Sequence, residues 1–138
     1  MRTFTLEKFI EIKGKIPFYK LLVNGKCPIS NFENEISKGT TYLSECKSII
    51  AFMDAYSNGT KLPPTKFKTL KVPKSKHSFF EFKSKHIRYY GFKYEDGIMI
   101  ICTAEKNDKS EQDKDILRVS NIAEECFSKL NVPKKIAT

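Results

Sequence analysis

Residues 87–103 constrain the fold most, because two runs rich in β-forming residues flank the pair Asp96-Gly97. Asp-Gly is a preferred pair for a two-residue turn between antiparallel strands, so the sequence predicts a β-hairpin here. Such a turn fixes the register and places Arg88 opposite Glu105. The better core face of this hairpin would then carry Tyr90, Phe92, Tyr94, Met99 and Ile101.

Helical spacing of apolar residues predicts two helices within residues 30–58 and a third that begins at Ser110 and ends before Pro133. The apolar stripe of the second helix consists of Leu43, Cys46, Ile49, Ile50, Met53 and Tyr56. Further β-rich runs lie at residues 4–12, 18–23 and 79–83, with an amphipathic helix as the alternative for the first. We therefore expect an α+β fold, in which an N-terminal helical hairpin and a C-terminal helix pack on one face of a small antiparallel sheet.

The length of 138 residues is typical of one domain that folds without a disulfide or a metal. The four cysteines form no CxxC pair and there are only two histidines, so we expect reduced core cysteines, no metal site and no cofactor. The longest apolar run, residues 98–102, is too short to span a bilayer, and the first residues do not resemble a signal peptide. These features predict a cytoplasmic protein without a membrane segment.

Positive charge is concentrated in one part of the chain. Residues 61–90 contain nine Lys and Arg residues and a single acid, Glu81, which accounts for nearly all of the net charge of +9. Such asymmetry indicates a polyanionic partner, either a nucleic acid or an acidic protein segment. The alternative is a lysine-rich face that serves only solubility.

Several segments, taken in order, resemble the RelE/HigB-like toxins of type II toxin–antitoxin systems, within the RelE/ParE superfamily. The similar segments are residues 27–36, which begin Cys-Pro-Ile-Ser-Asn-Phe, the connector 62–71 (LPPTKFKTLK), the strand 79–83 (FFEFK), residues 86–92 (HIRYYGF), the loop 104–110 and the helix 116–127. The resemblance covers residues 18–130, which it implies form a RelE-like toxin domain. Residues 1–17 would then be an N-terminal extension and residues 131–138 a basic C-terminal tail.

The resemblance implies a toxin that cleaves mRNA on the ribosome without a metal and that a cognate antitoxin protein holds inactive. Two alternatives remain open. One is a protein of the same fold without nuclease activity, which binds an antitoxin or inhibits a protein target such as gyrase. The other is a plain nucleic-acid-binding module, whose binding would weaken steeply with salt.

The catalytic candidates surround one predicted turn. Arg88 matches an arginine of the family pattern and is the predicted phosphate clamp, because a guanidinium can grip two oxygens; an ion pair with Glu105 is the alternative role. Lys83 and Lys85 are candidates for binding phosphate or moving protons, or are simply solvated. His86 is the candidate general acid or base, since the ordinary pKa of histidine lies at about 6.5; a structural or merely exposed turn histidine is the alternative.

A second set of residues is predicted to bind the RNA around these groups. The lysines of the connector and of the late loop would contact phosphates, and one tyrosine would stack on a base. These candidates are Lys66, Lys68, Lys71, Tyr89, Lys106 and Lys109.

Overall fold

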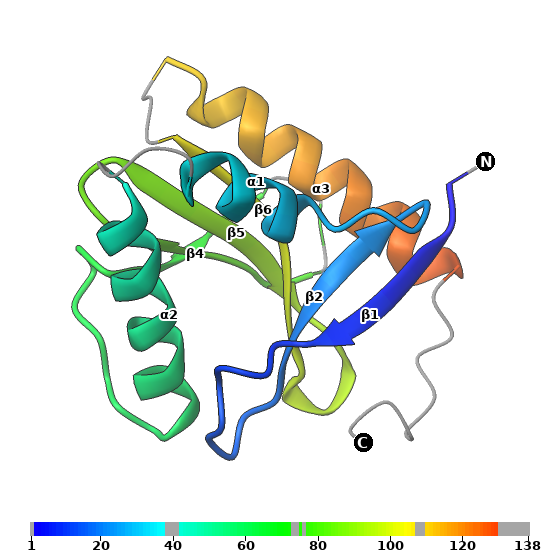
Figure 1. Cartoon of the computed structure of the whole chain (residues 1–138). Helices are drawn as coiled ribbons and strands as arrows, with labels where there is room; N and C mark the ends of the chain where they lie inside the picture. Colours follow the sequence, from blue (N-terminus) through cyan, green and yellow to red (C-terminus); the bar gives the residue numbers. More distant parts are fainter. Residues whose placement is uncertain (1, 38–41, 73–74, 76, 107–109, 130–138) are drawn as a thin grey trace.

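The computed structural model describes residues 2–37, 42–72, 75, 77–106 and 110–129. Its strands are β1 (Phe4–Lys8), β2 (Phe18–Val23), β3 (Phe67–Leu70), β4 (Phe79–Lys83), β5 (Ile87–Lys93) and β6 (Met99–Lys106). Its helices are α1 (Pro28–Ser37), α2 (Leu43–Ser57) and α3 (Gln112–Lys129). The strands form one sheet in the order β1-β2-β6-β5-β4-β3 (Figure 1). Neighbouring strands are antiparallel except β2 and β6, which are parallel.

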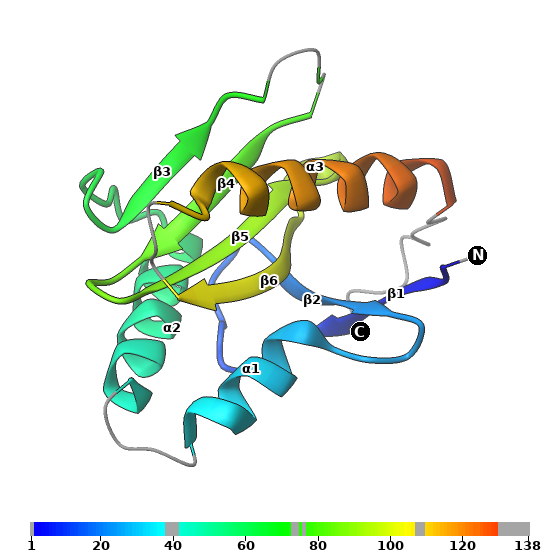
Figure 2. The same cartoon turned by 90° about the horizontal axis from the view of Figure 1, so that it is seen from above.

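Helices cover both faces of the sheet (Figure 2). On one face, α1 contacts β2 and β6 while α2 contacts β4 and β5; on the other, α3 contacts β5 and β6. Each face has its own apolar cluster. The α1–α2 cluster includes Phe18, Ile29, Ile49, Phe82 and Tyr89. The α3 cluster includes Leu21, Phe79, Phe92, Val119 and Cys126.

Alternation along the central strands builds both clusters at once. In β4, Phe79 joins the α3 cluster and Phe80 joins the α1–α2 cluster, and in β5 the neighbours Tyr89 and Tyr90 divide in the same way. Strands that bury side chains on both faces need a covering layer on each side. The aromatic runs of β4 and β5 therefore account for helices on both faces.

The predicted fold, a small antiparallel sheet with an N-terminal helical hairpin and all helices on one face, is wrong. The chain begins with two strands, the sheet is mixed, and α3 lies on the face opposite α1 and α2. The strand reading of residues 4–12 is confirmed over Phe4–Lys8, which pairs with β2 at one edge of the sheet. Parallel strands need a long connection, and the one between β2 and β6 contains α1, α2 and three further strands.

The predicted hairpin is present, but its turn has three residues rather than two. Glu95–Gly97 form a 3-10 turn in which Gly97 has a φ of 76°, and the Tyr94 amide donates to the Ile98 carbonyl at 2.7 Å. A three-residue turn that ends in a left-handed glycine is the next commonest hairpin connection. Near the turn it shifts the register by one residue, so that Lys93 lies opposite Met99.

A β-bulge between Tyr90 and Gly91 restores the predicted register farther along, where Arg88 lies opposite Glu105. Because a shift by one residue exchanges the faces of a strand, Met99 and Ile101 join the α1–α2 cluster instead of the face that carries Tyr90. The bulge requires a glycine at position 91. A Cβ there would lie 2.1 Å from the Ile100 carbonyl oxygen and 2.7 Å from the Phe80 ring.

Three findings concern the predicted absence of metal, disulfide and membrane segment. No helix within the described ranges is long and apolar enough to cross a bilayer. Among the same residues, no three His, Cys, Asp or Glu side chains are grouped so as to hold a metal ion. The four cysteines, all within the described part of the chain, are free thiols.

Candidate functional site

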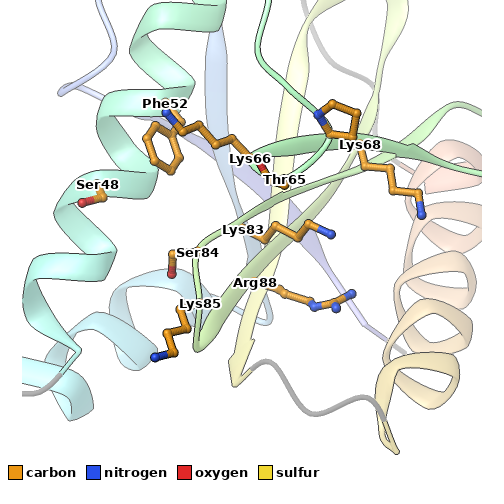
Figure 3. Close-up of a pocket in the computed structure, with 10 residues that line it drawn as sticks. Ser48, Phe52, Thr65, Lys66, Lys68, Lys83, Ser84, Lys85 and Arg88 are labelled. Carbon is orange, nitrogen blue, oxygen red and sulfur yellow. The ribbon is translucent and has the colours of Figure 1, made fainter.

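A cleft of about 750 Å³ lies where α2, the segment before β3 and the turn between β4 and β5 meet (Figure 3). Five cations line it, and none of its lining residues is acidic. The lining residues are Ser48, Phe52, Pro64, Thr65, Lys66, Lys68, Lys83, Ser84, Lys85 and Arg88. Cations from two lysine-rich sequence regions therefore line the same cleft.

Strand pairing accounts for this convergence. The Lys83 amide donates to the Lys66 carbonyl at 2.9 Å, and Lys83 lies opposite Arg88 in the β4–β5 register. Lys68 lies opposite Glu81, two residues before Lys83. Because side chains alternate along a strand, Lys68, Lys83 and Arg88 project to the same side, as Figure 3 shows.

Glu81 is the counterion of this cluster and is only 1% exposed. Its Oε2 accepts a hydrogen bond from Arg88 Nη1 at 3.0 Å, and its Oε1 lies 3.6 Å from Lys83 Nζ. Arg88, 5% exposed, is thus a buried cation with a buried partner. One buried carboxylate thus contacts two of the cations that line the cleft.

The alternative predicted role of Arg88, an ion pair with Glu105, is replaced by this pair with Glu81. The two residues do lie opposite each other in the sheet, but Glu105 is paired with Arg118 of α3. Burial raises the pKa of the Glu105 carboxyl, and the Arg118 charge acts in the opposite direction.

His86 lies beside the cleft, on the turn that also carries Ser84 and Lys85, but it is not among the lining residues. Glu45 of α2 anchors this turn: its Oε1 accepts from the His86 amide at 2.8 Å and from the Ser84 hydroxyl, and its Oε2 lies 2.6 Å from His86 Nδ1. Burial acts to raise the pKa of Glu45, but the hydrogen bonds from Ser84 and His86 outweigh it, and the pKa is lowered. A histidine bonded to a carboxylate through Nδ1 keeps Nε2 for exchange of a proton with a ligand.

The structure removes Tyr89 from the predicted RNA-binding set. Its side chain is fully buried, and its hydroxyl donates to Glu33 of α1 at 2.8 Å, so no face of the ring is available to a base. Burial and the neighbouring Glu33 charge raise the pKa of the Tyr89 hydroxyl strongly. Notably, Tyr90, which the sequence placed in the core, is buried as well.

Of the other predicted RNA-binding lysines, Lys71 and Lys106 do not line the cleft. Lys71 follows β3 and lies outside the cleft, beside Ser75 and His77. The Lys106 ammonium lies 5.7 Å from the centre of the Tyr42 ring, which also packs against His86 with the ring centres 5.3 Å apart. Lys109 lies outside the described residues. The cleft therefore brings together five of the predicted cations: Lys66, Lys68, Lys83, Lys85 and Arg88.

Sequence reasoning missed several residues of this region, among them Ser48, Phe52, Thr65, Glu45 and Glu81. For two of them, the sequence contained a feature that could have indicated their role. Glu81 is the only acid in residues 61–90, and a lone acid among cations indicates a counterion. Phe52 is an aromatic residue of α2 that falls outside the predicted apolar stripe, which indicates a ring at the margin of the buried face; the structure leaves it partly buried against the α1–α2 cluster.

Comparisons with protein-family models, with curated proteins and with solved structures found no match for this chain. The function must therefore be inferred from the chemistry of the cleft.

Proposed function

We propose that the cleft binds the sugar–phosphate backbone of RNA and that the protein is a metal-independent endoribonuclease of the toxin type. The observation that carries the proposal is the set of five cations that line one cleft whose lining residues include no acid. Lysine and arginine side chains that gather along one cleft provide the positive charge expected of a phosphate-binding groove.

The proposed reaction requires no group from outside the protein except the RNA. The 2′-oxygen forms a bond to the neighbouring phosphorus while the bond from phosphorus to the 5′-oxygen breaks, leaving a 2′,3′-cyclic phosphate and a 5′-hydroxyl end. Arg88 and Lys83, held by Glu81, would stabilise the negative charge that develops on the phosphate. His86, oriented by Glu45, would take the proton from the 2′-hydroxyl or return one to the 5′-oxygen.

The biological part of the proposal follows from the resemblance to RelE/HigB-like toxins. The substrate would be mRNA on the ribosome, the partner a cognate antitoxin protein, and the location the cytoplasm. A neighbouring gene for a small protein with a helix-turn-helix motif would support this part, and a free-standing gene would weaken it.

Binding of RNA without cleavage is a second candidate, and one observation favours it. His86 stands beside the cleft rather than in its lining, and both Arg88 and Lys83 are held by the Glu81 carboxylate. A cleft of this kind can bind phosphates without supplying a proton-transfer group. The affinity would then fall as salt is added. For a single strand, log K should decrease by roughly 0.7 per phosphate contact for each tenfold increase in salt concentration.

A cell-free translation reaction tests the proposal. Transcript ends are mapped for the wild type, for Lys83→Gln and His86→Gln, and for Lys8→Gln, an exposed lysine of the opposite edge strand, as a control. We expect cuts within translated codons that require ribosomes, that decrease at least about tenfold in both cleft variants and that persist in the control. Arg88→Ala is a poor first variant, since it leaves Glu81 buried without its arginine.

Each outcome has a clear meaning. An intact transcript with folded wild-type protein rules out the nuclease for this substrate. If the wild-type protein nevertheless binds RNA with a steep salt dependence, the second candidate is correct. Equal cleavage by Lys83→Gln and by the wild type would place the chemistry outside this cleft.

A further inference from the structure

The cleft has two chemically different halves. The phosphate half consists of Lys68, Lys83 and Arg88, whose side chains point toward the α3 side of the sheet (Figure 3). The base half is formed by α2 and the segment before β3, and it combines an aromatic ring, a proline and two hydroxyls with one lysine. Its residues are Ser48, Phe52, Pro64, Thr65 and Lys66.

Phe52 is the distinctive residue of the base half. It packs against the α1–α2 cluster and is only partly buried, as are Tyr56 and Phe67 of the same layer. Its ring projects from α2 toward the segment that carries Lys66 (Figure 3). The Lys66 ammonium lies 4.8 Å from the centre of the ring.

This contact indicates that one face of the Phe52 ring is accessible from the cleft. The group that occupies it is the end of a long, exposed lysine side chain and not a packed core residue. An exposed cation–π contact is weak, so a flat aromatic ligand can displace it. The displaced ammonium would then be available to a phosphate of the same ligand.

We infer that Phe52 stacks on a base of single-stranded RNA while the adjacent phosphates occupy the phosphate half. The inference rests on the proposed function, because it uses the backbone-binding role of the cations. The cleft volume of about 750 Å³ accommodates a nucleotide, since pockets for ligands of this size measure about 300–1,000 Å³. Stacking depends on the π face that every base has, so the site selects for unpaired bases rather than for one sequence.

The test measures binding with probes that cannot be cleaved. Fluorescein-labelled 2′-O-methyl hexauridylate is compared by anisotropy with an abasic hexamer of the same charge. The proteins are the wild type, Phe52→Leu, Lys68→Gln and Phe127→Leu. Phe127 is a partly buried aromatic residue of α3, outside the cleft, so Phe127→Leu is the matched control for loss of a ring.

We expect the wild type to bind the uridylate at least about fivefold more tightly than the abasic probe, because only the uridylate has a base that can stack on the ring. Phe52→Leu should lose this preference and leave the abasic affinity unchanged, while Phe127→Leu should bind both probes like the wild type. Lys68→Gln should weaken both probes by similar factors. Circular dichroism and thermal unfolding of each variant verify that the fold is retained.

Three results would overturn the inference. Wild-type behaviour of Phe52→Leu, with weakened binding by Lys68→Gln, would show a cleft that binds phosphates alone and leave the proposed function intact. Equal weakening of both probes by Phe52→Leu would show that the ring supports the shape of the cleft instead of a base. Failure of the wild type to bind either probe would remove the proposed function as well.

Discussion

Glu81 and Glu125 each hold one arginine and one lysine, but water reaches them to very different extents. Glu81 of β4 is buried between Arg88 and Lys83. Glu125 of α3 is partly exposed and binds Arg2, which precedes β1, and Lys129, one turn farther along the helix. The same three chemical groups thus occur once around a buried carboxylate of β4 and once around a partly exposed carboxylate of α3.

The comparison separates two uses of an ion pair. On the surface, solvent and salt screen the charges, and such pairs contribute little to stability. The buried charges of Glu81 and Arg88 depend on each other, because a lone buried charge is strongly unfavourable. The buried cluster therefore fixes the position of two cations at the cleft, while the surface cluster joins the start of the chain to α3.

The largest expected effect comes from removal of the buried cation. Arg88→Ala should lower the free energy of unfolding by about 3–5 kcal/mol, because Glu81 then remains buried without its main partner. Urea unfolding followed by circular dichroism measures this loss. Arg2→Ala is the matched variant of the surface cluster and should shift the urea midpoint far less.

The double variant Glu81→Met with Arg88→Met sharpens the same point. It removes both buried charges, so it should recover most of the stability lost in Arg88→Ala. If the double variant unfolds as readily as the single one, the cluster is not held together by its charges, and the contrast with Glu125 fails.

A smaller, pH-dependent effect is expected at Glu45, which anchors the turn beside the cleft. Burial acts to raise the pKa of Glu45, but hydrogen bonds from Ser84 and His86 lower it below the ordinary value of 4.5. A carboxyl whose pKa is lowered by folding stabilises the protein at pH values above its ordinary pKa. This contribution is lost as the pH falls from the ordinary pKa through the lowered pKa of the folded state. The melting temperature of Glu45→Gln should therefore lie below that of the wild type at pH 7, and the two should converge below about pH 4.5. A constant difference at all pH values would contradict the assignment.

The smallest effect is expected for Glu125→Gln. Hydrogen bonds from Arg2 and Lys129 lower the pKa of Glu125, but all three groups lie near the surface. The variant should lower the melting temperature less than Glu45→Gln does, and the difference should disappear at about 1 M salt, where exposed charges are screened within about 3 Å. A loss that persists at high salt would show that Glu125 is packed as Glu81 is.

Local patterns in the sequence predicted the secondary structure better than they predicted its arrangement. The hairpin of residues 87–103 and the apolar stripe of α2 follow from neighbouring residues, and both are present. The parallel pairing of β2 with β6 could not be predicted in this way, because it joins segments about eighty residues apart and leaves no local periodicity. The face assignment of Met99 failed for a different reason: one extra turn residue exchanges the two faces of a strand.

The candidate site shows the same division. The charge of residues 61–90 identified the cations that line the cleft. Burial could not be read from residue type, so Tyr89 was predicted to contact RNA although it lies in the core. The contributions of Ser48 and Phe52 depend on how α2 lies against the sheet, which only the three-dimensional structure shows.

The parallel pair of β2 and β6 also determines the order in which the chain can fold. Strands β3, β4 and β5 pair with near neighbours in sequence, so the part of the sheet that carries the cleft can form from local contacts. The pairing of Phe18 with Met99 requires closure of a much longer loop, and such non-local contacts slow folding. During synthesis on the ribosome, β1 and β2 are made well before β6, the last strand among the described residues, and they must wait for it before they can join the sheet.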